Sequence, residues 1–239
     1  MSTIWTQAEV TSNSEPLDGT FYRFIAKEAS NSTAKVTDTI EEIELLETLV
    51  RESRTDMPIG EYANYHPLLI RPFFTPPFPG GSRFGSETDF GVFYCAETIE
   101  TAAAERGYYV QKFRNDADAL TLMQGAPHSL ITVQVETQIV DVRIPPFKKR
   151  QDIFLENIDY SGTQKFAGVV RLTQVSGIIY TSVRNPIKSS CLAVLTPRAF
   201  KKKAPISLNE SWIAIATENR VRWINNSVTR ADKSMQFTY

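Results

Sequence analysis

The order of apolar and polar positions along the chain predicts more strands than helices. Runs rich in β-branched and aromatic residues predict strands over 20–25, 91–96, 130–135, 139–142, 177–182 and 191–195. Two further runs, 212–217 and 220–224, flank Glu218-Asn219 and predict a C-terminal hairpin. Because strands outnumber helices and short turns join many neighbours, we expect an α+β fold with a largely antiparallel sheet.

Three segments carry helix signals. Asp38 and Glu41 form a capping-box pattern before apolar residues at helical spacing, which predicts a helix that reaches residue 50. Thr98 is placed to cap a helix over 99–113, in which three consecutive alanines occupy 102–104. Ser161 is placed to cap a third helix over roughly 163–173.

Two parts of the chain depart from this pattern. Residues 1–19 are polar and predict a leader over the surface, whereas residues 56–82 hold six prolines, three phenylalanines and a Gly-Gly pair. Prolines at this density predict a loop without regular helix or central strand. We therefore expect one domain over 20–200 that contains this loop, and a C-terminal extension over 201–239 packed on the same domain.

Composition and charge narrow the class of protein. The chain has 239 residues, and its 26 basic and 27 acidic side chains give a net charge of −1, which offers no reason to expect nucleic acid or an anionic membrane as a partner. No apolar run approaches the roughly 18 residues of a membrane span, and the first residues lack the pattern of a signal peptide. The only cysteines, Cys95 and Cys191, lie in apolar runs. We expect a cytoplasmic protein without disulfides or a metal site.

The candidate chemistry rests on carboxylate, guanidinium and hydroxyl groups. Common catalytic motifs are absent, and His66 and His128 are the only histidines, far apart in the chain. Arg83 lies in a Gly-Gly-Ser-Arg-Phe-Gly segment, where glycines allow close approach of a ligand and the guanidinium can bind phosphate. The alternative for this segment is an ordinary turn.

Two other segments carry candidate groups. Glu105 lies on the predicted helix 99–113 and shares a face with Ala102 and Tyr109, where it can point toward the sheet. The alternative is a surface glutamate paired with Arg106 or Gln111. Ser182 ends the strand 177–182, and hydroxyls at such positions commonly satisfy turn backbone groups.

The order and spacing of these residues resemble one family. Arg83 is followed after eleven residues by Tyr94, after eleven more by Glu105, and later by Ser182 at the end of a Gly-Ile-Ile-Tyr strand. This combination resembles the RES domain, which is named for its arginine, glutamate and serine. An early strand with Tyr22-Arg23 is also similar to the opening of that family. The resemblance covers roughly residues 20–200.

The resemblance implies a β core like that of ADP-ribosyltransferases, flanked by helices, and an activity that degrades NAD⁺ by hydrolysis or phosphorolysis. NAD⁺ is then the substrate, inorganic phosphate is a candidate co-substrate, and no cofactor or metal is needed. Family members are typically toxins of bacterial toxin–antitoxin pairs, neutralised by a helix-turn-helix antitoxin. The long segment before Arg83 and the continuation past Leu195 depart from compact members and leave the partner and the regulation open.

Residue roles follow from the same resemblance. Glu105 is expected to stabilise the positive charge that develops on the ribose, and Arg83 to bind the pyrophosphate. Tyr94 is expected to border the nicotinamide, and Ser182 to bond a ribose or phosphate oxygen. Tyr22 and Arg23 complete the expected NAD⁺-binding set.

Two other functions remain open from the sequence. The same pocket could transfer ADP-ribose to a protein target, as a mono-ADP-ribosyltransferase does. Alternatively, the chain could be a non-catalytic module whose Pro/Phe loop binds a partner. The loop itself is expected to form one wall of the pocket, with a homo-oligomer interface as the alternative because exposed phenylalanines commonly mark one.

Overall fold

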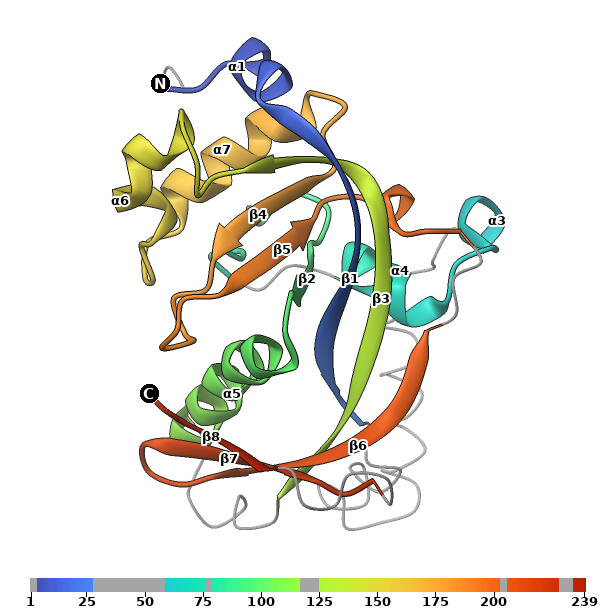
Figure 1. Cartoon of the computed structure of the whole chain (residues 1–239), viewed down its shortest axis with the longest axis vertical. Helices are drawn as coiled ribbons and strands as arrows, with labels where there is room; N and C mark the ends of the chain where they lie inside the picture. Colours follow the sequence, from blue (N-terminus) through green and yellow to red (C-terminus); the bar gives the residue numbers. More distant parts are fainter. Residues whose placement is uncertain (1–3, 28–58, 76–78, 117–124, 203–205, 228–233) are drawn as a thin grey trace.

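The computed structural model describes residues 4–27, 59–75, 79–116, 125–202, 206–227 and 234–239. They form a mixed α+β domain in which helices flank a single sheet (Figure 1). The helix predicted to reach residue 50 lies outside the described residues. None of the described helices is long and apolar enough to cross a membrane.

The strands form one eight-stranded sheet in the order β1-β2-β5-β4-β3-β6-β7-β8, and β1 also pairs with β3. Their pairings are antiparallel except that of β3 with β4, which confirms the prediction of a largely antiparallel sheet. The strands are β1 (Ser14–Ala26), β2 (Phe93–Ala96), β3 (Ala126–Asp141), β4 (Gly177–Thr181), β5 (Ser190–Val194), β6 (Ser207–Ala216), β7 (Arg220–Asn225) and β8 (Ser234–Thr238). The helices are α1 (Gln7–Ser12), α3 (Ile59–Tyr62), α4 (Pro67–Phe74), α5 (Ile99–Asp116), α6 (Gln151–Phe154) and α7 (Ser161–Arg171), with short 3-10 turns η3 (Phe147–Arg150) and η4 (Pro197–Ala199).

Strand β3 is one continuous strand, so the prediction of two strands over 130–135 and 139–142 was wrong. The polar residues between the two predicted strands pair with β1, in the register Leu17 with Thr137 and Asp18 with Glu136. Backbone hydrogen bonds to β1 therefore continue through a polar stretch that has no apolar side chain to mark it as a strand. The long β1–β3 pair runs the length of the sheet (Figure 1).

The N-terminal segment is part of the fold rather than a surface leader. Thr6 caps α1 by accepting a hydrogen bond from the backbone N–H of Glu9. Trp5 and Val10 are buried, and the Trp5 ring lies 5.1 Å from Phe166 and 5.7 Å from Phe154 between ring centroids. The polar composition concealed this role because two large apolar side chains are enough to anchor a short segment.

The Pro/Phe segment contains helices α3 and α4, so the prediction of a loop without regular helix was wrong. Pro67 takes the first position of α4, where a missing N–H costs nothing, and the side chain of His66 accepts a hydrogen bond from Leu68 N. Pro72 lies inside the helix, which ends two residues later. Phe73 is buried against Phe200.

Two apolar clusters occupy opposite faces of the sheet. The first is covered by α5, α6 and α7, and the second by α4 and η4. Alternate residues of β5 divide between them, with Cys191 in the first and Leu192 in the second. Phe73 belongs to the second cluster, and Glu105 packs on the first. The prediction that the loop over 56–82 forms one wall of the pocket therefore does not hold for Phe73, whereas Ser82 at the end of the loop lies in the turn that holds Arg83.

The C-terminal hairpin is confirmed and continues into a further strand. β6 and β7 pair from Trp212↔Asn225 to Ala216↔Val221, and β8 adds to β7. The Tyr239 hydroxyl after β8 donates to the Ala104 carbonyl of α5 at 2.6 Å. This contact places the end of β8 against the helix that carries Glu105 (Figure 1).

Candidate active site

Helix α5 presents Glu105 to the sheet. Thr98 caps the helix by accepting a hydrogen bond from the Thr101 N–H at 3.1 Å, as the sequence predicts. Three buried alanines, 102–104, let the helix lie close to the strands. Because the helix lies close to the strands, the Glu105 carboxylate reaches the end of β4 and the start of β5, where it accepts hydrogen bonds from Ser182 and Cys191. The alternative of a surface glutamate paired with Arg106 or Gln111 is thus wrong.

The electrostatics of Glu105 combine burial with nearby positive charge. Burial raises the pKa of Glu105, whereas the hydrogen bond from Ser182 and the charges of Arg83 and Arg184 oppose the rise. The net direction is upward, because the loss of water around the carboxylate outweighs the compensating contacts. A carboxylate held this way acts strongly on any positive charge that forms beside it.

Ser182 orients both the carboxylate and the turn after β4. Its hydroxyl donates to Glu105 Oε1 at 2.5 Å and accepts from the backbone N–H groups of Arg184 and Asn185 at 3.2 and 3.0 Å. The side chain of Asn185 in turn donates to Thr101 Oγ1 at 2.8 Å. Ser182 therefore stabilises the turn, as expected of a hydroxyl at the end of a strand, and also bonds to Glu105.

The turn that holds Arg83 is fixed by backbone and side-chain hydrogen bonds. Ser82 N donates to Gly85 O at 2.7 Å, and Gly85 N donates back to Ser82 O at 3.3 Å. Gly81 has a φ of 72°, and a Cβ added there would lie 2.3 Å from Gly85 O, so the turn requires glycine. Gln164 of α7 donates to the carbonyls of Gly80 and Ser82 at 2.9 and 3.0 Å.

The Arg83 guanidinium is buried among neutral partners. Its Nη1 donates to the carbonyls of Phe154 and Glu156 at 3.2 and 2.6 Å. The guanidinium carbon lies 4.8 Å from the ring centroid of Tyr160 and 5.9 Å from that of Tyr180. Arg83 is also one of the two arginines whose charge opposes the rise in the pKa of Glu105, so the structure brings Arg83, Ser182 and Glu105 together.

Tyr94 joins the Arg83 turn to β2. Its hydroxyl lies 2.9 Å from Ser82 Oγ and accepts a hydrogen bond from Phe84 N at 2.9 Å. Burial raises the pKa of Tyr94. The residue is therefore placed to position the turn, in addition to any contact with a ligand.

Tyr22 and Arg23 point to opposite faces of β1. Tyr22 packs against the first cluster, on the face of Glu105. Arg23 lies over the ring of Phe93 at 4.5 Å, and Phe93 belongs to the second cluster. Burial lowers the pKa of Arg23 to about 10, and its Nη1 donates to the Tyr94 carbonyl at 3.3 Å. The structure thus does not bring Arg23 to Glu105, because consecutive strand residues face opposite sides.

Several residues around Glu105 received no role from the sequence. The Arg184 guanidinium carbon lies 3.5 Å from the ring centroid of Tyr108, on α5 three residues after Glu105. Tyr109 is 51% exposed, and burial together with the nearby Tyr160, Tyr94 and Glu105 raises the pKa of its hydroxyl. In the sequence, the position of Arg184 two residues after Ser182 was the only feature that could have indicated a place in the site.

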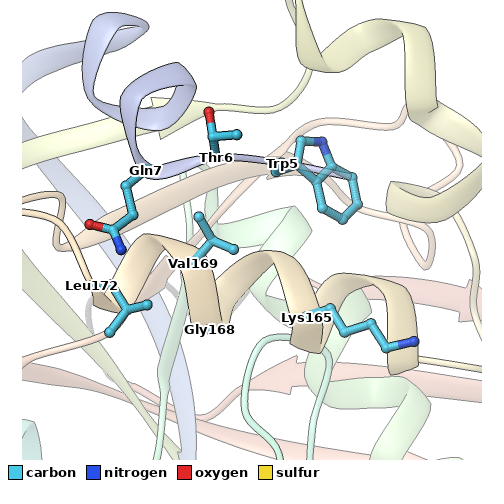
Figure 2. Close-up of a pocket in the computed structure, with 7 residues that line it drawn as sticks. All are labelled: Trp5, Thr6, Gln7, Lys165, Gly168, Val169 and Leu172. Atoms are coloured by element: carbon cyan, nitrogen blue, oxygen red, sulfur yellow. The ribbon is translucent and has the colours of Figure 1, made fainter. Parts of the chain in front are cut away.

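One hollow of the described structure lies away from this group. A groove between the start of the chain and α7 is lined by Trp5, Thr6, Gln7, Lys165, Gly168, Val169 and Leu172 (Figure 2). Its lining contains no carboxylate to serve as an acid, base or electrostatic stabiliser. Across the described ranges, no three His, Cys, Asp or Glu side chains gather as metal ligands would.

The site is therefore a carboxylate, a hydroxyl and two guanidinium groups on a mixed α+β fold, without histidine. The family model of the RES domain matches residues 59–216, so the chain belongs to the RES domain family. The matched range contains Arg83, Tyr94, Glu105 and Ser182, whereas β1 with Tyr22 precedes it.

Comparison with solved structures also finds similar chains. A chain in the crystal structure of the M. tuberculosis MbcT–MbcA toxin–antitoxin complex is similar to this chain, with 15% sequence identity and a TM-score of 0.49. The similarity covers 84% of this chain and 87% of that chain. No curated protein matches the sequence.

Proposed function

We propose that this chain cleaves the nicotinamide–ribose bond of NAD⁺, with Glu105 as the carboxylate beside the ribose. The observation that supports this most directly is the contact between Ser182 and Glu105 Oε1 at 2.5 Å, with two arginines nearby. Glu105 Oε2 accepts no hydrogen bond from a described residue, so it is available to a ribose hydroxyl. Membership of the RES domain family supports the same substrate.

The reaction suits a site without histidine. The bond from the ribose carbon to the pyridinium nitrogen breaks, and its electron pair moves to that nitrogen, so nicotinamide leaves as a neutral molecule and needs no acid. The ribose then carries oxocarbenium-like positive charge, which the Glu105 carboxylate stabilises. Water as the acceptor forms ADP-ribose and releases a proton, whereas phosphate as the acceptor forms a phosphorylated ADP-ribose.

The other residues bind and position the dinucleotide. Arg83 uses the guanidinium nitrogens that are not bonded to main-chain carbonyls for the pyrophosphate. Tyr94 holds the Arg83 turn and borders the nicotinamide, and Tyr22 extends the same face of the sheet. Ser182 keeps Glu105 Oε1 occupied, so that Oε2 faces the ribose.

Purified protein incubated with NAD⁺ should release nicotinamide. Product analysis with and without phosphate distinguishes hydrolysis from phosphorolysis, because only the second reaction depends on phosphate. Added lysate provides protein acceptors. With labelled NAD⁺, transfer of the label to protein without formation of free ADP-ribose indicates a mono-ADP-ribosyltransferase instead. Folded protein that releases no nicotinamide under these conditions would contradict both activities and favour a non-catalytic interaction module.

We further propose that the chain acts in the cytoplasm as the toxin of a toxin–antitoxin pair. An enzyme that consumes NAD⁺ depletes a metabolite on which the whole cell depends, so a neutralising helix-turn-helix antitoxin is the expected partner. Cys95 and Cys191 are both free thiols and buried, which suits a reducing compartment.

Expression of the wild-type chain in a bacterial host without an antitoxin should stop growth as cellular NAD⁺ falls. The Glu105→Gln variant at the same expression level should permit growth, because it lacks the stabilising charge. Glu100→Gln removes an exposed carboxylate from the first turn of the same helix and should stop growth as the wild type does. Normal growth and normal NAD⁺ in cells that contain active wild-type enzyme would contradict the toxin role.

A further inference from the structure

Two arginines reach the same short segment from different elements. The Arg83 side chain donates to the carbonyls of Phe154 and Glu156, and Arg184 Nη2 donates to the next carbonyl, Asn157 O, at 3.1 Å. The segment joins α6 to α7, and Arg184 belongs to the connection between β4 and β5, which lies between α6–α7 and α5 (Figure 1). The two guanidinium groups therefore converge at one place beside Glu105.

The hydrogen-bond partners of both guanidinium groups at this place are uncharged. Main-chain carbonyls are neutral, and neither arginine forms an ion pair with a carboxylate in the described part of the chain. Glu156 and Asp159 lie on the same segment, but their carboxylates accept hydrogen bonds from backbone N–H groups of that segment. The charges of both arginines oppose the rise in the pKa of Glu105, and neither guanidinium is held in a direct ion pair with a described carboxylate.

Both guanidinium groups keep donors for a ligand. Arg83 uses only Nη1, and Arg184 uses only Nη2, in the hydrogen bonds formed with described residues. The Tyr108 ring lies against the Arg184 guanidinium at 3.5 Å, and the Arg184 backbone N–H donates to Ser182 Oγ. Arg184 is therefore held in a defined position relative to Glu105 before a ligand arrives, which reduces the entropy lost on binding.

We propose that Arg184 is a second phosphate-binding residue, which acts with Arg83 on the pyrophosphate of the dinucleotide. Two guanidinium forks match the two phosphate groups in number and geometry, and together they offset the two charges of the pyrophosphate. This inference rests on the proposed function for its substrate. The same chemistry would also suit inorganic phosphate as a co-substrate, so the test must separate the two sources.

The test measures ADP-ribose binding by calorimetry, which needs no turnover. Arg184→Gln should raise the Kd for ADP-ribose about tenfold, and Arg184→Lys, which keeps charge without the fork, should raise it less. Adenosine, which has no phosphate, is the ligand control. Arg150→Gln is the matched protein control, because Arg150 is an exposed arginine near α6 that pairs with Asp152. It should bind ADP-ribose as the wild type does.

Several outcomes would overturn the assignment. The first is an unchanged affinity for ADP-ribose in folded Arg184→Gln. The second is a variant in which only the dependence of turnover on phosphate is weakened, because that result would assign Arg184 to the phosphate co-substrate. A lower kcat with unchanged ADP-ribose affinity indicates a structural role. If Arg184→Gln does not fold, wild-type affinity in Arg184→Lys overturns the proposal, and a weakened affinity supports it. Weaker ADP-ribose binding without nicotinamide release by the wild type supports the subsite while the proposed reaction fails.

Discussion

Glu105→Gln is expected to reduce the kcat for nicotinamide release by on the order of 100-fold, with a much smaller change in substrate affinity. The substitution keeps the shape of the side chain and an oxygen that can accept from Ser182, so the turn after β4 should remain in place. It removes the negative charge, which acts only as positive charge develops on the ribose. Steady-state kinetics with NAD⁺ measure both quantities.

Glu100→Gln is the matched control, because Glu100 lies exposed in the first turn of the same helix. It should retain wild-type kcat. Wild-type turnover in a folded Glu105→Gln protein would remove Glu105 from the reaction. Equal losses in the two variants would show that the net charge of the helix, rather than the position of Glu105, is what matters.

The pH dependence of the same residue has a definite sign. Burial raises the pKa of Glu105 in the folded chain, so activity should fall as the pH decreases through that raised pKa. The raised pKa also means that ionisation of Glu105 destabilises the fold: the effect is absent below the unfolded pKa, grows between the unfolded and the folded pKa, and is constant above the folded pKa. Glu105→Gln should therefore be more stable than the wild type at neutral pH, and the difference should shrink in acid.

Gly81→Ala is expected to reduce kcat/KM by on the order of 100-fold, because misplacement of a binding group by about 1 Å can cost that much. Gly81 has a φ of 72°, and a Cβ added there would lie 2.3 Å from Gly85 O. The Gln164 side chain, 3.0 Å from the same Cβ, can move, but the backbone carbonyl cannot move without opening the turn. An open turn no longer presents Arg83 to the substrate.

Gly80→Ala makes a sharp comparison for this prediction. Gly80 also has a positive φ, 82°, but a Cβ there would meet no heavy atom within 4 Å among the described residues beyond its chain neighbours. It should lose roughly 1 kcal/mol of stability through the left-handed backbone alone and keep kcat/KM close to the wild-type value. Equal kinetic losses in the two variants would show that backbone strain, not contact with Gly85, controls the site.

Local signals in the sequence predicted the elements that carry the site. The capped helix with Glu105, the apolar strand that contains Tyr94 and the apolar strand before Ser182 follow from periodicity and capping, which depend on neighbours in the chain. The β6–β7 hairpin is local in the same sense. Segments whose structure depends on a distant partner were predicted wrongly. β3 continues through polar residues because β1 pairs with it, and the N-terminal segment is anchored because Trp5 meets Phe166.

The candidate site divides in the same way between sequence and tertiary structure. The sequence by itself predicted Arg83, Glu105 and Ser182 as candidate site residues, because the residue types and their spacing are written along the chain. Only the tertiary structure decided that Arg23 faces away from Glu105 and that Arg184 lies beside it. Those two outcomes depend on which face of a strand a residue occupies and on how a connection folds against a distant helix. Both outcomes are set by packing between elements. The order of residues within one element does not encode that packing.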